Sequence, residues 1–419
     1  MPLKVLHLST FDTNGGAARA AYSLHRAMLH EGISSSMWVG RKGSDDPTVQ
    51  QVSGGRIQVT SALDRQLWKL QRSTLKTWRS PARFSALSAE QINRSGSDIV
   101  NLHWVTDGFL SIEEIGKIRK PIVWSMYDMW PFSGTEHYGT DQLDSRWRSG
   151  YSPRNRPYDE SGFDLDRWTY KRKFQHWRTG SQAIHMAPAS TWLMEATQQS
   201  ALMGDFPITK IPHVIDTEVF SPMSRSEARY KLGIQTNAPL ALFLASAGTG
   251  DKRKGWDLLD QAVSEVLPRV PDLNILIVGP QSNWISPISE APIHWHGQVG
   301  SNRELALLYN AADVTVVPSR EDNMPLTAME AQSCGRPVVA FSIGGLADIV
   351  DDGATGFLAP RNDTHQLARC LLEALTGYQA TKEMGIRARL RAESLWSNKP
   401  VVNAMTELSI QVTTGTRRR

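Results

Sequence analysis

Residues 316–358 read VVPSREDNMPLTAMEAQSCGRPVVAFSIGGLADIVDDGATGFL. The pattern predicts an apolar strand over 314–317 that ends in a polar loop, a short helix that Pro325 opens, and a second strand over 338–341. Gly335 stops the helix, and a glycine turn follows the second strand. A helix N-terminus at the carboxyl end of a parallel strand readily binds phosphate. The stretch therefore predicts a βαβ unit that holds a phosphorylated ligand.

Two acids stand eight positions apart in this stretch. Asp322 lies in the polar loop, and Glu330 lies about one turn into the helix. Carboxylates in such a cavity can accept hydrogen bonds from sugar hydroxyls, so the combination suits a nucleotide-sugar. The alternative is a purely structural βαβ unit whose two acids are solvated.

The stretch resembles the donor-site signature of glycosyltransferase family 4, a retaining family with the GT-B fold. The family pattern is a glutamate, seven residues and a second glutamate, then a Cys-Gly-x-Pro-Val-Val-like run. Here it reads Asp322 to Glu330 followed by SCGRPVV over 333–339, with Asp in place of the first Glu. NLHW over 101–104 and DMWPF over 128–132 look similar to the bacterial exopolysaccharide and colanic-acid-type members.

The length of 419 residues favours two domains. Alternating strands and helices predict α/β architecture, and the resemblance implies two doubly wound Rossmann-like domains that face a central cleft. We expect an N-terminal acceptor-side domain over 1–210 and a nucleotide-sugar-binding domain over 211–398. Residues 399–419 should form a helix that crosses back to the first domain, followed by a basic tail.

The composition indicates where the protein is located and which cofactors it could hold. No apolar run approaches the roughly 18 residues of a membrane span, and the N-terminus reads as a strand, not a signal peptide. The only cysteines, Cys334 and Cys370, predict neither a disulfide framework nor a metal cluster. We expect a cytoplasmic protein, possibly peripheral to the inner face of the membrane, with no metal site and no cofactor besides a UDP- or GDP-linked sugar donor.

Several residues are candidates for donor binding. Gly15 and Gly16 follow the first strand, where backbone N–H groups can approach a phosphate. Lys254 follows the first strand of the second domain, and its charge could stabilise a leaving diphosphate. The family usually has an Arg where this chain has Gly248, so Lys252, Arg253 or the glycine loop would replace that Arg. By resemblance, Asp322, Asn323 and Met324 hold the donor sugar, Leu326 and Thr327 meet the diphosphate, and Glu330 binds the ribose.

The acceptor side should lie at the ends of two strands of the first domain. Asp128 could accept a proton from the acceptor hydroxyl, and His103 ends a neighbouring strand. Relatives often carry His before this Asp, where this chain has Tyr127. The structural alternatives are a helix cap for Asp128 and an ordinary sheet-edge histidine for His103. We name Asp128, Lys254, Asp322 and Glu330 as the catalytic candidates.

A basic, aromatic-rich stretch covers residues 144–178. It holds nine Lys and Arg residues against five Asp and Glu residues, an excess as large as the +4 of the whole chain. Such a stretch can bind an anionic membrane or a glycan acceptor, can be the solvated face of a helix over about 164–177, or, less readily, can bind nucleic acid.

Together these patterns predict a metal-independent glycosyltransferase, and the resemblance implies that it is retaining. It would move a sugar from a nucleoside-diphosphate-sugar to a hydroxyl of a glycan or lipid-linked acceptor, in surface polysaccharide biosynthesis. The alternatives are a non-catalytic nucleotide-sugar or glycan-binding protein, and a GT-B epimerase or phosphorylase.

Overall fold

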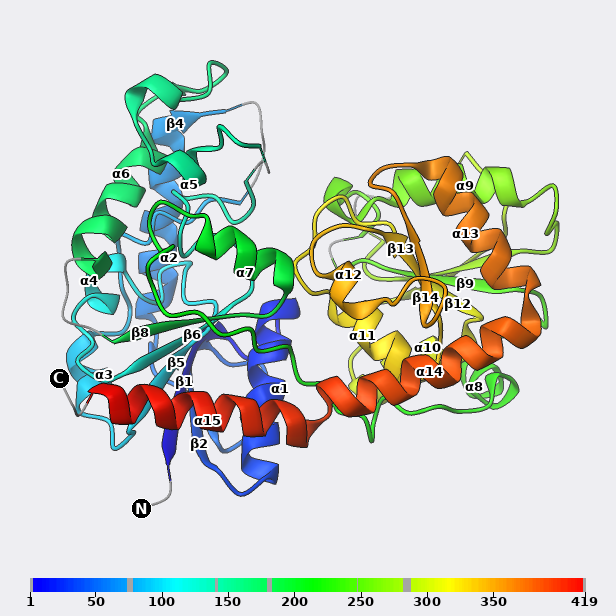
Figure 1. Ribbon diagram of the computed structural model, residues 1–419, viewed down its shortest axis with the longest axis horizontal. Coiled ribbons are helices and arrows are strands. Elements are labelled where there is room, and N and C mark those ends of the chain that lie inside the picture. The colour runs from blue at the N-terminus through cyan, green and yellow to red at the C-terminus, as the bar shows by residue number, and fades with distance from the viewer. Residues whose placement is uncertain are drawn as a thin grey trace. The chain divides into compact units, whose positions relative to one another are not determined.

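The computed structural model describes residues 3–73, 78–139, 142–178, 183–246, 248–281 and 288–416. The chain forms two compact units (Figure 1). Unit 1 consists of Met1–Pro212 with Val402–Arg419, and unit 2 consists of His213–Val401. The expected basic tail, 417–419, lies outside the described residues.

Unit 1 is built on a parallel six-stranded sheet in the order β3-β2-β1-β5-β6-β8. The strands are β1 (Lys4–Phe11), β2 (Ser34–Arg41), β3 (Val49–Gln51), β5 (Ile99–Leu102), β6 (Ile122–Met126) and β8 (Ile184–Pro188). Two further strands, β4 (Gln71–Arg72) and β7 (Ser161–Gly162), pair antiparallel beside it. The predicted parallel sheet is confirmed, while β3 and β8 were not expected.

Alternation along β1 explains how the sheet of unit 1 is covered. Leu6 and Leu8 belong to the main core, which also includes Ile57, Ile115 and Leu193. His7 points to the opposite face, where its ring meets His25 of α1. The helices are α1 (Gly16–His30), α2 (Arg56–Leu67), α3 (Ala89–Asn93), α4 (Ile112–Ile115), α5 (Arg146–Ser149), α6 (Leu165–Lys173) and α7 (Thr191–Gln198), with short turns of helix at η1 (Trp68–Leu70), η2 (Pro153–Asn155) and η3 (Phe174–Arg178).

Unit 2 repeats the architecture with the strand order β11-β10-β9-β12-β13-β14, again all parallel. Its strands are β9 (Leu240–Leu244), β10 (Asn274–Val278), β11 (Ile293–Gly297), β12 (Val314–Val317), β13 (Val338–Phe341) and β14 (Gly356–Ala359). Its helices are α8 (Arg225–Leu232), η4 (Lys252–Lys254), α9 (Trp256–Val266), α10 (Asn302–Ala311), α11 (Leu326–Ser333), α12 (Leu346–Ile349), α13 (Thr364–Thr376) and α14 (Tyr378–Trp396). Strands β12 and β13 have the bounds that the sequence predicted.

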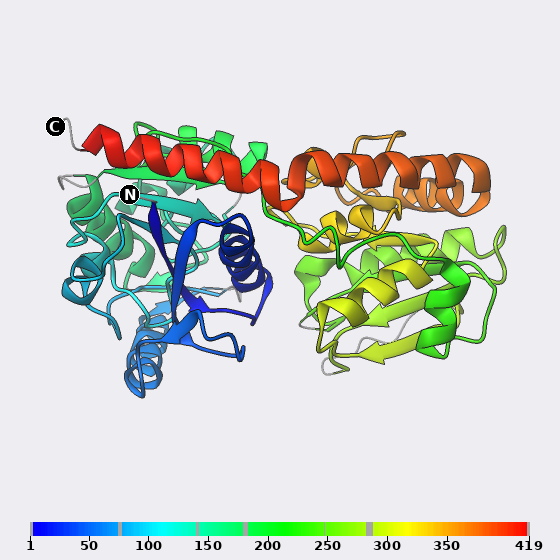
Figure 2. The ribbon, with the colours of Figure 1, turned by 90° about the horizontal axis from the view of Figure 1, so that it is seen from below.

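The last helix, α15 (Asn398–Thr416), belongs to unit 1 from Val402 onward. There it lies along the sheet (Figure 2), and the Asn101 amide is 3.9 Å from the Met405 sulfur. Val402 and Met405 are buried in this contact face. The C-terminal segment thus covers part of the first sheet.

The basic stretch over 144–178 differs from an ordinary solvated helix face. Arg146 pairs with Asp164 at 2.7 Å, and Arg172 pairs with Glu113 at 2.7 Å. Lys173 is fully buried and donates to the carbonyl oxygens of Trp130, Ser133 and Gly134. The alternative of a solvated helix face is wrong for Arg172 and Lys173, because both side chains are buried and bonded to neighbouring segments of unit 1.

Candidate active site

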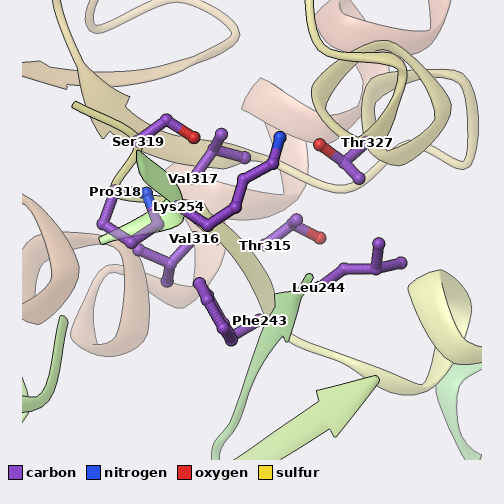
Figure 3. Close-up of a pocket in the computed structure, with 9 residues that line it drawn as sticks. All are labelled: Phe243, Leu244, Lys254, Thr315, Val316, Val317, Pro318, Ser319 and Thr327. Atoms are coloured by element: carbon purple, nitrogen blue, oxygen red, sulfur yellow. The ribbon is translucent and has the colours of Figure 1, made fainter. Parts of the chain in front are cut away.

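A pocket opens at the carboxyl ends of β9 and β12 in unit 2 (Figure 3). Phe243 and Leu244 line one side, and the Lys254 ammonium, the Thr327 hydroxyl and the Ser319 hydroxyl gather on the other. The remaining lining residues are Thr315, Val316, Val317 and Pro318. Carboxyl strand ends are where open α/β sheets bind ligands.

Lys254 lies in a short turn of helix, η4, beside this pocket. The Asp251 carboxylate accepts a hydrogen bond from the Arg253 N–H at 3.0 Å and so caps η4. Gly255 follows with φ of 73°, and a Cβ there would lie 1.9 Å from the Pro318 carbonyl oxygen. Only glycine allows this close approach, which brings Lys254 against the end of β12.

Lys254 and Arg253 both reach the Asp322 carboxylate. The Lys254 Nζ donates to Asp322 Oδ2 at 2.7 Å, and Arg253 Nη1 lies 3.7 Å from the same oxygen. Burial alone would raise the pKa of Asp322, but the two cations outweigh it and hold that pKa below its ordinary value. Asp322 is therefore an ionised acceptor at neutral pH.

The predicted diglycine turn supports the Asp322 loop. Gly344 has φ of 50°, and a Cβ there would lie 1.8 Å from the Asp322 carbonyl oxygen. Asn323 and Met324, two of the residues expected to face the donor sugar, are buried beside it. The glycine pair thus allows the turn after β13 to pack closely against the loop that contains Asp322.

Helix α11 begins directly after this loop, with Pro325 as its N-cap. Leu326 and Thr327 form its first turn, and Thr327 lines the pocket. N–H groups of a first helical turn lack partners within the helix, so they can bind an anion. Glu330 lies one turn further, is 2% exposed, and its Oε2 accepts a hydrogen bond of 2.8 Å from the Tyr309 hydroxyl.

The glycine loop of unit 1 has the predicted position. Gly15, with φ of 91°, is the N-cap of α1, and Gly16 is the first residue of this helix. Both are exposed, and a Cβ at either position would meet nothing within 4 Å. The loop therefore presents open backbone at a helix N-terminus, as a phosphate contact requires.

The Asp128 carboxylate is held by several donors at the carboxyl end of β6. Its Oδ2 lies 2.5 Å from His137 Nδ1 and accepts from the Trp104 indole at 3.2 Å, while Oδ1 accepts from the Trp130 N–H at 3.0 Å. His137 Nε2 in turn lies 2.8 Å from the Ser80 hydroxyl. Asp128 thus anchors the loop that follows β6, as well as being a candidate base.

The predicted residues fall into two groups. Lys254, Arg253, Asp322 and Thr327 meet around the pocket of unit 2, while Lys252 is exposed and does not line it. Gly15, Gly16, His103, Tyr127 and Asp128 follow strand ends in unit 1.

Four further residues of these sites were not predicted from the sequence: Ser319, Thr315, Tyr309 and His137. The Thr315 hydroxyl, buried in the pocket lining, has no hydrogen-bond partner among the residues that the structure describes.

Two features are absent from the described ranges. Within them, no group of three or more His, Cys, Asp and Glu side chains has an arrangement that could hold a metal ion. Nor does any helix in the same ranges have the length and apolar character that crossing a membrane requires.

Comparison with known proteins identifies relatives for both halves of the chain. Residues 238–377 match the family model described as Glycosyl transferases group 1. A D-inositol 3-phosphate glycosyltransferase of Actinosynnema mirum is 33% identical over 228 residues, which cover 48% of this chain and 54% of that protein. The Nocardiopsis dassonvillei protein of the same name is 26% identical over 84% of this chain and 81% of its own. The chain thus spans about half the length of the first of these relatives.

Solved structures match over nearly the whole chain. A sucrose-phosphate synthase from Thermosynechococcus elongatus has a TM-score of 0.64 at 16% identity and covers 98% of this chain and 100% of its own. HepE of Anabaena, in complex with UDP and glucose, has a TM-score of 0.65 at 15% identity, with coverage of 97% and 99%. Two parallel six-stranded sheets of this kind are those of GT-B structures, so the predicted fold is confirmed.

Proposed function

We propose that this chain is a group 1 glycosyltransferase that moves a sugar from a nucleoside-diphosphate-sugar to a hydroxyl acceptor. The observation that carries the proposal is the convergence of Lys254 and Arg253 on ionised Asp322, beside the first turn of α11. The match of residues 238–377 to the group 1 model covers this site.

The pocket chemistry suits the diphosphate part of a donor. Lys254 and Arg253 supply positive charge, Thr327 and Ser319 supply hydroxyls, and the first turn of α11 supplies N–H groups. UDP is favoured as the nucleotide over GDP, since the HepE structure contains UDP and glucose and a pneumococcal O-GlcNAc transferase, GtfA, was solved with UDP and GlcNAc.

The acids would bind the two sugars of the donor. Asp322 would accept bonds from hydroxyls of the transferred sugar, and Glu330 would accept bonds from the ribose hydroxyls. Glu330 needs its environment to open for this role, because its side chain is 2% exposed and bonded to Tyr309. Asn323 and Met324 would complete the sugar-binding loop.

For catalysis we propose a retaining, metal-independent route. Lys254, Arg253 and the N–H groups of α11 would stabilise the charge on the leaving diphosphate. No side chain near Asp322 is assigned as a nucleophile, so the acceptor would attack from the face that the diphosphate leaves. The leaving group would then take the acceptor proton.

The acceptor is proposed at the level of chemical class. We infer a sugar or polyol hydroxyl in glycan or surface polysaccharide biosynthesis, bound near His103, Tyr127 and Asp128. The relatives' names support this class: D-inositol 3-phosphate is named for several, and WaaG, a structural match with a TM-score of 0.60, is involved in lipopolysaccharide biosynthesis.

A donor screen tests the proposal. The full chain is mixed with UDP-, GDP- and dTDP-linked sugars and simple polyol acceptors, with and without EDTA, and released nucleoside diphosphate is measured. One donor should turn over, EDTA should leave its rate unchanged, and Asp322→Asn should lower it about a hundredfold. Binding without any release would favour a non-catalytic protein, and rescue of an EDTA-blocked rate by Mg²⁺ or Mn²⁺ would overturn metal independence.

A further inference from the structure

A buried lysine of unit 1 has no role in the proposed function. Lys173 is the last residue of α6, and its side chain is fully buried. Its Nζ donates hydrogen bonds to three backbone carbonyl oxygens, those of Trp130, of Ser133 at 3.2 Å and of Gly134 at 2.8 Å. All three belong to the loop over 128–137, between β6 and α5, which we call the Asp128 loop.

The number of acceptors identifies the charged form of this lysine. Burial lowers the pKa of Lys173 well below its usual range, and the Glu136 and Asp128 carboxyl groups oppose this effect. An ammonium group has three N–H donors, whereas a neutral amine has two and would turn its lone pair toward the third oxygen. The Nζ also lies 4.0 Å from the centroid of the Trp130 ring, where a cation is attracted to the ring face. The hydrogen bonds therefore favour the ammonium.

The shape of the Asp128 loop depends on a cation at this point. Carbonyl oxygens that converge on one position repel each other through their dipoles, and a cation between them turns this repulsion into attraction. The loop is closed by its own backbone, since the Met129 N–H donates to the His137 carbonyl at 2.9 Å and the Ser133 N–H donates to the Met129 carbonyl at 3.0 Å. Lys173 supplies the cation for the closed loop from a neighbouring helix.

The same loop holds the Asp128 carboxylate. Trp130 forms the most direct connection, because its N–H donates to Asp128 Oδ1 at 3.0 Å while its carbonyl oxygen accepts from Lys173. At the other end of the loop, His137 Nδ1 lies 2.5 Å from Asp128 Oδ2. A movement of Trp130 would therefore move a donor that fixes Asp128, and with it the contact between Asp128 and His137.

We propose that Lys173 is a positioning residue, whose ammonium sets the shape of the Asp128 loop and so holds the Asp128 carboxylate in the orientation that binds the acceptor. The inference rests on the proposed function, in which the acceptor binds near Asp128, and it deepens that function. It has one specific consequence. When the side chain is removed, a primary ammonium ion should be able to replace it, and a cation without N–H groups should not.

Nitrogen NMR tests the role of the ammonium without any substrate. In ¹⁵N-lysine-labelled unmodified protein, Lys173 Nζ should give an ammonium signal at neutral pH, and Lys173→Arg should remove that signal. In ¹⁵N-histidine-labelled protein, Lys173→Ala should shift the ring-nitrogen signals of His137. Added n-propylammonium, which has the carbons and the nitrogen that this substitution removes, should return them. A neutral amine at Lys173, or unchanged His137 signals in Lys173→Ala, would overturn the proposal.

Turnover tests the effect on function, with UDP-glucose as donor, myo-inositol as acceptor probe and released UDP as the readout. Lys173→Ala should lower turnover at least about tenfold, since misplacing a group by about 1 Å can cost about a hundredfold. UDP affinity should not change, because the UDP pocket lies in unit 2. n-Propylammonium should restore about half of the lost rate, and tetramethylammonium should restore none. Lys117→Ala, which removes an exposed ammonium paired with Glu114 at 2.8 Å, is the matched control.

The possible results distinguish this inference from the proposed function. Equal rates of Lys173→Ala in the two ammonium salts, or a loss of its UDP affinity, would overturn the positioning role. If Lys173→Ala does not fold, the Lys173 signal of the unmodified protein decides. If the unmodified protein releases no UDP with any donor and acceptor, the proposed function fails, and the signals of Lys173 and His137 decide whether the ammonium sets the shape of the loop.

Discussion

The Lys254 ammonium and the Asp322 carboxylate form a 2.7 Å hydrogen-bonded ion pair at the pocket of unit 2. Their positions lie 68 residues apart in the sequence, at the ends of two adjacent strands. The pair keeps Asp322 ionised, and it also neutralises the cation that would face a diphosphate. A bound donor must therefore share Lys254 with Asp322.

Replacing Asp322 should separate nucleotide binding from turnover. Asp322→Asn frees Lys254 from its counter-ion, so UDP affinity should stay the same or rise. Turnover should fall about a hundredfold, because the sugar loses a charged hydrogen-bond acceptor. Calorimetry with UDP and a release assay measure the two effects. Asp257→Asn, which breaks the exposed pair with Arg320, is the control, and a large loss of UDP affinity in Asp322→Asn would contradict the account.

Glu330 should act on the nucleoside and not on the diphosphate. Glu330→Ala should weaken UDP binding by roughly 1–3 kcal/mol, since two ribose hydroxyls lose their acceptor. Pyrophosphate binding should not change. Tyr309→Phe, which removes only the hydroxyl that bonds Glu330, should cost less, about 1 kcal/mol. Equal losses of binding free energy for UDP and pyrophosphate would show that Glu330 supports the structure of the site and does not bind the ribose.

The membrane interpretation of residues 144–178 depends on the basic side chains that remain accessible. Arg154 and Lys171 are exposed and Arg167 is half-buried, whereas Arg172 and Lys173 are buried. Changing Arg154, Arg167 and Lys171 together to Gln should release the protein from anionic liposomes. Each of these charges should contribute on the order of 1 kcal/mol of binding free energy at low salt.

The control for this test removes the same charge from unit 2. Arg269, Arg303 and Lys382 are exposed there, and their change to Gln should leave liposome binding intact. Co-sedimentation at two salt concentrations measures both variants, because screening weakens such binding. If the unmodified protein does not sediment with anionic liposomes at low salt, the stretch has no membrane role.

Asp64 should make stability depend on pH. Its Oδ1 accepts from the Arg83 and Phe84 N–H groups, and its Oδ2 has no hydrogen-bond partner within the described part of the chain. Burial raises the pKa of Asp64 to about 6. Between pH 4 and 6 the folded state keeps a proton that the unfolded state has lost, so this group lowers the unfolding free energy as pH rises. The difference between about 6 and the ordinary 3.8 corresponds to on the order of 3 kcal/mol.

Chemical denaturation of Asp64→Asn against the unmodified protein isolates this contribution. The variant cannot titrate at this position, so the difference between the two curves should change with pH between 4 and 6 and level off above. The same comparison cancels the opposite contribution of His25, whose pKa burial lowers to about 4. A pH-independent difference would show that Asp64 is ionised in the fold throughout this range.

The sequence predicted the fold correctly where the local sequence pattern and the packing of the element favour the same secondary structure. Strands β12 and β13 and helix α11 were placed correctly because apolar runs, Pro325 and Gly335 mark their ends. Strand β8 was missed because Ile184–Pro188 is short and ends in a proline, and only its pairing with β6 makes it a strand. The burial of Lys173 could not be predicted from the sequence either, since its hydrogen-bond partners are backbone carbonyls, which carry no sequence signal.

The candidate site was predictable in part for the same reason. Asp322 and Lys254 each follow a strand, so their meeting could be inferred from the topology. The bond between Tyr309 and Glu330 joins two different helices, and the bond between Ser80 and His137 joins two loops, so no spacing in the sequence indicates either. Such contacts depend on how elements pack, which a single sequence does not specify.

Calorimetric UDP titration of two neighbouring lysine variants tests most directly whether Lys254 binds the donor diphosphate. Lys254 lines the pocket and Lys252 is exposed outside it, so the two substitutions remove the same charge two residues apart. Lys254→Ala should weaken UDP binding by roughly 2 kcal/mol, the value of a charged hydrogen bond, and Lys252→Ala should leave it unchanged. Equal affinities for the two variants would contradict the account.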